Sequence, residues 1–210
     1  MNVYTAIKTR RTIRDFEDKP IEMKIIEKII DAGLRAPTND HMRNWEFVIV
    51  NDKNIRADIL KIIPETTPLT KEGADELLNE WGLIDAVQRN MYLDAVPKQQ
   101  AMLYNSGCLI LPFFKCNEPL LQPKTLSSLN EFASIWCCIE NMLLAATAEG
   151  VFGVTRIPLG NEPQYIKNVV GYPNDYILPC YIGLGYPAKD TFINIQKEVS
   201  VKDKIHIDKW

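Results

Sequence analysis

Apolar residues recur at helical spacing in the first part of the chain. Residues 2–9 place Val3, Ala6 and Ile7 on one face. Residues 21–35 repeat this pattern over three turns, with charged side chains on the other face, and Pro37 disfavours any continuation of the helix. The pattern predicts two helices, the second with an apolar face made of Ile25, Ile26, Ile29, Ile30 and Leu34.

Segments rich in β-branched, aromatic and aliphatic residues predict strands at 45–50, 108–114 and 176–184. Further helices are expected at 54–63, capped by Asn54, at 127–149, ended by Gly150, and at 162–170. Strands and helices do not alternate regularly, which argues against a doubly wound sheet. The predicted fold class is α+β, with helices surrounding a small mixed or antiparallel sheet.

The chain length of 210 residues favours a single domain spanning residues 1–210. Residues 64–98 are polar, but Trp81, Leu83 and Ile84 suggest a helical excursion that packs on something. Such a segment either covers a site as a lid or is a surface insertion, and the pattern favours neither. Residues 188–210 are expected to form a C-terminal tail that reaches a partner subunit.

Composition limits the possible functions. A formal net charge of −3 argues against a general nucleic-acid binder. The most apolar stretch, residues 132–148, contains Glu140 and is short for a bilayer span, and the N-terminus does not resemble a signal peptide. We therefore expect a cytoplasmic protein that contacts neither membrane nor nucleic acid.

Cysteine and glycine motifs point to no common metal or nucleotide site. The five cysteines are odd in number and form no CxxC, and there are two histidines, so neither a disulfide framework nor a zinc site is expected. Cys137 and Cys138 are expected to be buried small hydrophobes. A Rossmann GxGxxG and a P-loop are both missing from the sequence.

Three arginines follow the first helix: Arg10, Arg11 and Arg14. If the helix continued, Arg10 and Arg14 would share a face. Guanidinium groups bind phosphate bidentately, so the cluster suggests a site for a phosphorylated ligand. A solvated basic surface is the alternative.

Two loops offer further ligand contacts. The segment from Ala36 to His41 supplies short polar side chains, but its residues are also ordinary turn formers. The loop from Arg156 to Gly160 follows the predicted core helix, and its backbone N–H groups and apolar side chains suit a flat ring. Each loop also fits a plain connection between elements.

Taken together and in this order, these segments resemble the nitroreductase family of FMN-dependent oxidoreductases. The resemblance rests on Arg10-Arg11-Thr12-Ile13-Arg14-Asp15-Phe16, on Ala36-Pro37-Thr38 followed by Trp45-Glu46-Phe47, on the segment from Gly150 to Gly160, on Leu184-Gly185-Tyr186-Pro187, and on Ile205-His206 with Trp210 in the tail. It covers nearly the whole chain.

The resemblance implies an intertwined homodimer with FMN at the interface, NAD(P)H as electron donor and ping-pong reduction of nitroaromatics, quinones or similar small acceptors. The flavin would carry the chemistry, so no catalytic side chain is expected. Arg10, Arg11 and Thr12 would hold the phosphate and ribityl chain, and Arg14 would approach the pyrimidine edge. The other implied contacts are Pro37, Thr38, Asn39 and His41 to the partner's FMN, Ile157, Pro158, Leu159 and Gly160 near the ring, and Lys197 as a second phosphate ligand.

The chain departs from the family pattern before the first predicted strand. Where the family usually has Asn-x-Gln-Pro-Trp, this chain has His41-Met42-Arg43-Asn44-Trp45. The scaffold also leaves other activities open: reductive dehalogenation, enone reduction or azoline oxidation, a flavin-storing protein with little turnover, or an interaction protein without flavin. The enzymes among these would differ in the lid expected within residues 64–98.

Overall fold

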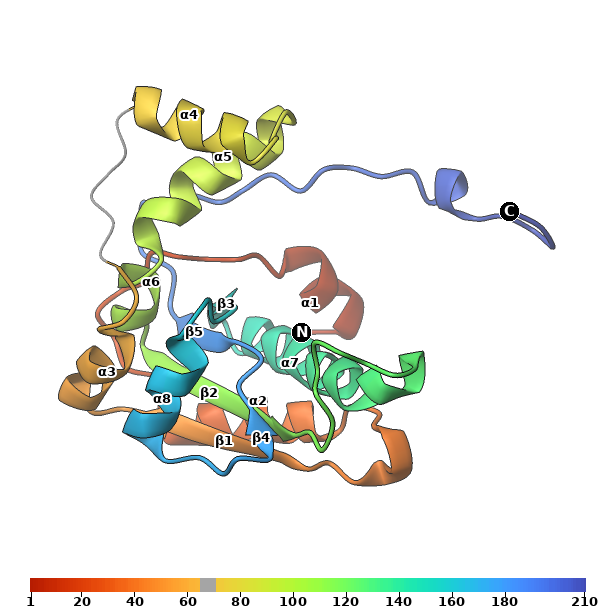
Figure 1. The fold of residues 1–210 in the computed structure, drawn as a ribbon. Helices are drawn as coiled ribbons and strands as arrows, with labels where there is room; N and C mark the ends of the chain where they lie inside the picture. The colour runs from red at the N-terminus through yellow and green to blue at the C-terminus, as the bar shows by residue number, and fades with distance from the viewer. Residues whose placement is uncertain (65–70) are drawn as a thin grey trace.

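The computed structural model describes residues 1–64 and 71–210, and the remaining part of the predicted lid, residues 65–70, lies outside it. Helices and a small sheet make up the body (Figure 1). The helices are α1 (Val3–Thr9), α2 (Met23–Leu34), α3 (Lys53–Leu60), α4 (Lys71–Glu80), α5 (Ala86–Ala95), α6 (Ala101–Tyr104), α7 (Asn130–Ala148) and α8 (Glu162–Val170). Short 3-10 turns are η1 (Asn39–His41), η2 (Val96–Lys98), η3 (Leu126–Leu129) and η4 (Val201–Lys204).

The strands form one sheet in the order β1-β2-β5-β3, in which every pairing between strands is antiparallel. Their bounds are β1 (Trp45–Val50), β2 (Cys108–Lys115), β3 (Phe152–Arg156), β4 (Tyr176–Ile177) and β5 (Tyr181–Gly185). The short β4 pairs with the end of β2, where Phe114 faces Ile177. The α+β class predicted from the sequence is confirmed.

Both faces of the sheet are buried, as the uninterrupted apolar run of β2 requires. Ile110 and Phe114 face a cluster that contains Ile29 of α2 and Ile139 of α7. The alternate residues of β2 face the other cluster, which includes Leu60 of α3, Met102 of α6 and Ile166 of α8. Helices therefore cover the sheet on two sides.

Close packing of α2 on α7 fixes the first layer. A Cβ built on Gly33 of α2 would lie 2.6 Å from Cγ of Met142 and 2.9 Å from Sγ of Cys138. Any larger residue would push the two helices apart. The buried face of α2 is the one predicted, with Ile26 and Ile29 fully buried and Ile25, Ile30 and Leu34 packed beside them.

Several predicted boundaries are wrong. Asp52, not Asn54, caps α3, because its Oδ1 accepts from the N–H groups of Asn54 and Ile55. The predicted strand 176–184 is two strands, separated by residues 178–180. Cys138 is buried as expected and burial raises its thiol pKa to about 12, but Cys137 is exposed.

The strand β3 was not predicted. Thr155 and Arg156, which were expected to begin a loop, pair in β3 with Ile182 and Tyr181 of β5. The long helix was predicted well: α7 ends at Ala148, and Gly150 follows with a φ of 76°. It begins later than predicted, because η3 occupies residues 126–129.

Two parts of the chain extend from this body. Helices α4 and α5 form an arm at one end, and the tail leaves β5, passes near α5 and runs outward (Figure 1). Trp81 and Ile84 lie at the turn between α4 and α5, where Trp81 packs edge-on against Tyr92. No helix in the described residues is long and apolar enough to span a bilayer.

Candidate functional site

The segment after α1 is extended, not helical. The helix ends at Thr9, and Arg10 already has a φ of −52° and a ψ of 130°. Thr12 forms a parallel bridge with Gly153, and the N–H of Ile13 donates to the Gly153 carbonyl at 3.2 Å. The expected helical face shared by Arg10 and Arg14 is therefore wrong. Instead, the segment lies along the free edge of β3, where side chains alternate in direction.

Phe16 fixes the far end of this segment. It bridges to Pro187, and a Cβ on Gly185 would lie 2.5 Å from its ring. Ile13 is buried in the body of the protein. Alternate residues of an extended chain point to opposite sides, so Arg10, Thr12 and Arg14 are expected on the side opposite Ile13.

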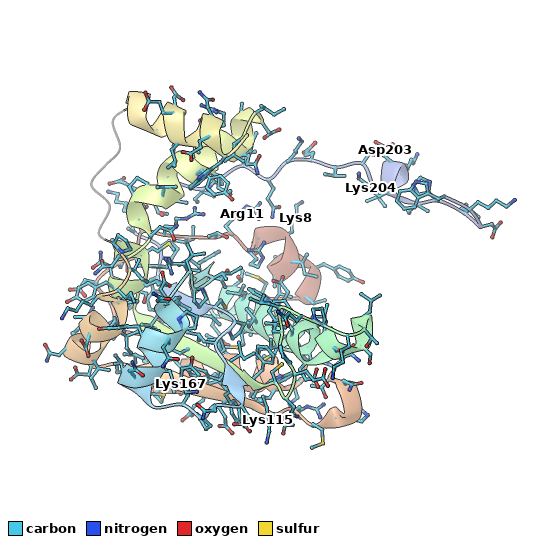
Figure 2. The ribbon with its side chains drawn as sticks, viewed as in Figure 1. Lys8, Arg11, Lys115, Lys167, Asp203 and Lys204 are labelled. Carbon is cyan, nitrogen blue, oxygen red and sulfur yellow. The ribbon has the colours of Figure 1, made fainter. Side chains whose placement is uncertain are left out.

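The three arginines have different surroundings. Arg10 Nε lies 3.7 Å from Glu140 Oε1 on α7, and both side chains are partly exposed. Arg11 donates to the carbonyls of Lys8 and Arg10, and Figure 2 shows Lys8 and Arg11 close together at the end of α1. Arg14 is the most enclosed, with a side chain 9% exposed.

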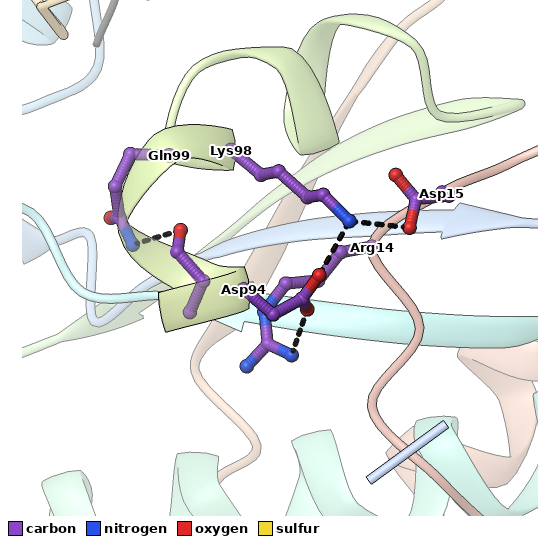
Figure 3. A network of polar contacts seen from close by, with 6 residues as sticks. Arg14, Asp15, Asp94, Lys98 and Gln99 are labelled. Carbon is purple, nitrogen blue, oxygen red and sulfur yellow. Dashed lines mark hydrogen bonds and ion pairs between the residues drawn. The ribbon is translucent and has the colours of Figure 1, made fainter. Parts of the chain in front are cut away.

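Arg14 belongs to a chain of four alternating charges, here called the Arg14 cluster: Arg14, Asp94, Lys98 and Asp15 (Figure 3). Arg14 Nη1 lies 3.2 Å from Asp94 Oδ2, and Lys98 Nζ lies 2.5 Å from Asp94 Oδ1 and 2.6 Å from Asp15 Oδ2. Partial burial opposes the charge on Lys98, but the hydrogen bonds that Lys98 donates to Asp15 and Asp94, together with their negative charges, outweigh burial and raise its pKa.

A cavity of about 560 Å³ opens beside the Arg14 cluster. Its lining includes Arg14, Asp15 and Lys98, with Phe16 and Tyr104 as aromatic walls. The cluster therefore borders open space on one side and packed protein on the other. This location lets Arg14 meet a ligand without exposing its whole side chain to water.

The Pro37 loop lies elsewhere on the chain. Thr38 and Asn39 line a smaller hollow of about 80 Å³ with Ser134 of α7, whose Oγ accepts from the Asn39 N–H. Ser134 and Glu140 are six residues apart on α7, so they lie about 120° apart around the helix axis. Within one chain, the Pro37 loop and Arg10 thus meet different faces of α7.

The two departures from the family pattern have unusual backbones. His41 has a φ of 56° and Arg43 a φ of 45°, a region that residues other than glycine seldom adopt. Arg43 folds back on its own chain, donating from Nε to the Leu34 carbonyl at the end of α2 and from Nη1 to the His41 carbonyl. These bonds hold the loop in shape.

The loop after β3 is exposed. Ile157 is 59% and Leu159 64% exposed, and Gly160 has a φ of 52°. Pro158 is half-buried between them. Two large apolar side chains of this loop therefore lie at the surface, and the flat ring expected beside them stays a prediction.

Directly before this loop is a second charged group, here called the Arg156 cluster: Arg156, Glu162, Tyr181 and Gln99. Arg156 makes a bidentate pair with Glu162, at 2.5 and 2.8 Å, and donates from Nε to Gln99 Oε1 at 2.8 Å. The Tyr181 hydroxyl donates to Glu162 Oε2 at 3.0 Å. Burial, and then the Glu162 charge, raise the pKa of Tyr181.

Lys197 lies on the tail. Its Nζ is 3.0 Å from Asp85 Oδ2 at the start of α5, and its side chain is 69% exposed. The Gln88 N–H and then Lys197 lower the pKa of Asp85. The predicted phosphate ligand therefore pairs with the α4–α5 arm in this structure and not with Arg10 or Arg11.

Most of this chain matches one known protein family. The model of the Nitroreductase family matches residues 7–186. The chain belongs to the nitroreductase family. This match spans both charged clusters, the Pro37 loop and the loop after β3.

Two kinds of relative are found among curated proteins. One, from Methanothermobacter thermautotrophicus and provisionally named an NADH dehydrogenase/NAD(P)H nitroreductase, is 28% identical over 100% of this chain and 88% of its own length. The iodotyrosine deiodinase of Danio rerio is 27% identical over 95% of this chain, and the match covers 65% of that protein.

Solved structures share the fold. The FMN-dependent nitroreductase of Clostridium difficile is 18% identical with a TM-score of 0.64, covering 98% of each chain. An iodotyrosine deiodinase bound to FMN and 3-iodo-L-tyrosine is 16% identical with a TM-score of 0.72, covering 100% of each chain. The nitroreductase fold expected from the sequence is confirmed.

Sequence reasoning missed Asp94, Lys98, Gln99 and Glu162. Asp94 is 80 positions from Arg14, and no local pattern links the two. The one available signal was the identity of Arg156 and Glu162, which lie on either side of a short loop and carry opposite charges.

Proposed function

We propose that this protein is an FMN-dependent oxidoreductase that uses NAD(P)H to reduce nitroaromatics, quinones or similar small acceptors in a ping-pong cycle. Family membership supports the oxidoreductase class, and the names of several relatives support both FMN and the nicotinamide donor. The observation that carries the proposal is the extended Arg10–Arg14 segment, which ends in an enclosed arginine beside a cavity.

The residues present fit a flavin nucleotide. Arg14 Nε and Thr38 Oγ1 are both buried without a hydrogen-bond partner among the described residues. Buried polar atoms are rarely left unpaired, so each suggests a partner that is not part of the chain. Arg56 Nε and Thr191 Oγ1 are also unpaired, but Arg56 already donates to three backbone carbonyls, which explains its burial.

Each predicted contact then has a role in the proposal. Arg10, Arg11 and Thr12 hold the phosphate and ribityl chain, and Arg14 presents a cation to the pyrimidine edge. The loop from Ile157 to Gly160 supports the ring. Bound FMN would supply the hydride and electron transfer, so the chain need only bind, orient and shield it.

The Pro37 loop is assigned to the other subunit's cofactor. Thr38 and Asn39 of this loop lie by a different face of α7 from Arg10, which supports assigning Pro37, Thr38, Asn39 and His41 to a second site shared between two chains. Lys197 is the weakest member of the set, because Asp85 already neutralises it. It would reach a phosphate only if the tail is placed differently in a dimer.

Exposed apolar side chains support a homodimer. The tail carries Ile195 at 84%, Val201 at 70% and Ile207 at 81% exposure, and Tyr4 on α1 is 81% exposed. An extended tail that carries several large apolar side chains can bury them by lying against a second subunit. Sedimentation of the full chain should give twice the mass of 24.0 kDa, and a flavin-loaded monomer would contradict this assignment.

Reductive dehalogenation is the second candidate, favoured by the deiodinase relatives. It would use the same cofactor and differ in the substrate held under the α4–α5 arm. One experiment separates the candidates. The purified protein is checked for flavin absorbance, mixed in a stopped-flow instrument with NADH or NADPH, and then offered a nitroaromatic, a quinone and a halogenated phenol.

Fast reduction by a nicotinamide and reoxidation by the nitroaromatic or quinone is the expected result. Reoxidation by the halogenated phenol alone would favour the dehalogenase. Bound flavin that neither nicotinamide reduces would leave a flavin-storing protein, and a colourless protein that takes up no FMN would refute the proposal.

A further inference from the structure

Asp94 holds Arg14 in place from a distant part of the chain. It lies near the end of α5, and its carboxylate accepts the one hydrogen bond that Arg14 donates among the described residues. Both side chains are enclosed, at 9% and 11% exposure. An ion pair in so little water is stronger than one at the surface, and it restricts where the guanidinium can point.

Lys98 completes the arrangement. It binds the second oxygen of Asp94 and also Asp15, the residue next to Arg14 (Figure 3). The Asp94 carboxylate is therefore shared between two cations and does not fully neutralise Arg14. The four charges sum to zero. Asp94 lowers the net positive charge around Arg14, and Lys98 raises it.

Gln99 fixes the position of Lys98. Its Oε1 accepts from Arg156 Nε, and its Nε2 donates to the Ala95 carbonyl. Adjacent residues thus tie the end of α5 both to the Arg14 segment and to the end of β3. Lys98 reaches Asp94 and Asp15 from an anchored backbone.

We propose that Asp94 and Lys98 are positioning residues that set the charge Arg14 presents to FMN, and through it the reduction potential of the cofactor. This inference rests on the proposed function, since it places the pyrimidine edge of FMN near Arg14. A cation near that edge stabilises the anionic reduced flavin, and a carboxylate opposes it.

The two residues should therefore shift the potential in opposite directions. Asp94→Asn keeps an acceptor oxygen but removes a negative charge, so the potential should rise. Lys98→Met removes a positive charge and leaves Asp94 to Arg14 alone, so the potential should fall. We expect about a tenfold change in the ratio of reduced to oxidised flavin at fixed potential, which for a two-electron couple is about 30 mV.

The test is potentiometric titration of the FMN-loaded protein, followed by its visible spectrum. Asp94→Asn, Lys98→Met and their double variant are compared with wild type, and the double variant should return toward the wild-type value because the net charge is restored. Asp75→Asn is the matched control. It breaks the 2.7 Å ion pair with Arg89 in the same arm, away from Arg14, and should leave the potential unchanged.

Opposite shifts with an unchanged control would support the inference. Shifts of the same sign, or an equal shift in Asp75→Asn, would overturn the inference because they indicate a general structural effect. No shift at all would also overturn it, because the two residues would then not influence the cofactor. Failure of the proposed function would look different. Wild-type protein that takes up no FMN would refute both the proposed function and this inference. Protein that NAD(P)H reduces, but whose potential is the same in every variant, would refute only this inference.

Discussion

Lys98 and Gln99 are neighbours in sequence but belong to different clusters: Lys98 to the Arg14 cluster and Gln99 to the Arg156 cluster. In the Arg156 cluster, both Nη groups and Nε of the arginine have partners, and Tyr181 adds a further bond to Glu162. In the Arg14 cluster, the arginine has one carboxylate partner and an unpaired buried Nε among the described residues, and a cavity lies alongside.

The difference indicates what each cluster does. A buried arginine whose three nitrogens each donate to a protein acceptor is held in place at every nitrogen and stabilises the fold. One that is held by a single carboxylate and keeps a donor free is oriented but incomplete. We therefore interpret the Arg156 cluster as structural support for the loop after β3, and the Arg14 cluster as part of the proposed flavin site.

The largest effect is expected from Glu162→Ala. This change leaves Arg156 charged and buried without its bidentate partner, which typically costs about 3–5 kcal/mol. Urea unfolding of the purified protein measures the loss directly. A free energy of unfolding equal to that of wild type would contradict the structural interpretation of this cluster.

Two further variants calibrate that result. Tyr181→Phe removes only the hydroxyl that donates to Glu162 and should lower the free energy of unfolding by about 1–2 kcal/mol. This variant still tests the cluster if Glu162→Ala fails to fold. Lys24→Met, which removes an exposed pair with Glu22, should change the unfolding free energy very little.

A smaller effect is expected for Lys98→Met, and it should depend on pH. The raised pKa of Lys98 means that its stabilisation is fully present below the ordinary value of 10.5 and is lost as the pH rises through the raised value. Near neutral pH the free energy of unfolding of wild type should therefore be about 1 kcal/mol larger than that of the variant. Unfolding measured from pH 7 to 11.5 should show the two converging only at the alkaline end. A difference independent of pH would argue against a charged role.

The smallest effect on folding is expected for Thr38→Val. The buried Thr38 hydroxyl has no hydrogen-bond partner within residues 1–64 and 71–210, so its removal breaks no hydrogen bond there. The flavin-free protein should be as stable as wild type or up to about 1 kcal/mol more so, while FMN affinity falls several-fold. Thermal unfolding and fluorescence titration provide the two readings.

Thr147→Val is the matched control for that variant. Its buried hydroxyl donates to the Leu143 carbonyl at 2.9 Å, so the same chemical change should cost about 1 kcal/mol in the flavin-free protein. If both threonine variants lose the same stability, the unpaired state of Thr38 has no functional meaning.

Local patterns predicted the regular parts of this fold. The apolar face of α2, the aromatic and β-branched content of β1 and the extent of α8 were recognisable in the sequence, and the predicted bounds match closely. Asp52 and Asn54 both suit a helix cap and lie two positions apart, so sequence alone did not separate them. The strand β3 is short, contains Gly153 and exists because β5 pairs with it.

The candidate site was predictable only as separate segments. The arginines and the two loops were identifiable, yet the extended path of Arg10 to Arg14 depends on the edge of β3, which was itself missed. The partner of Arg14, Asp94, comes from α5, and Lys98, which shares that carboxylate, comes from η2, both far along the chain. Ion pairs between distant segments follow from tertiary packing, which a single sequence does not display.

Titration of the flavin-free protein with FMN tests the central claim most directly. Arg10→Ala with Arg14→Ala removes two charge-assisted contacts of about 1.5–3 kcal/mol each, so affinity should fall at least about a hundredfold while the fold persists. Lys28→Ala with Arg35→Ala, which removes equal charge from exposed pairs on α2, should bind like wild type. Full FMN affinity in the Arg10 and Arg14 variant would contradict the account.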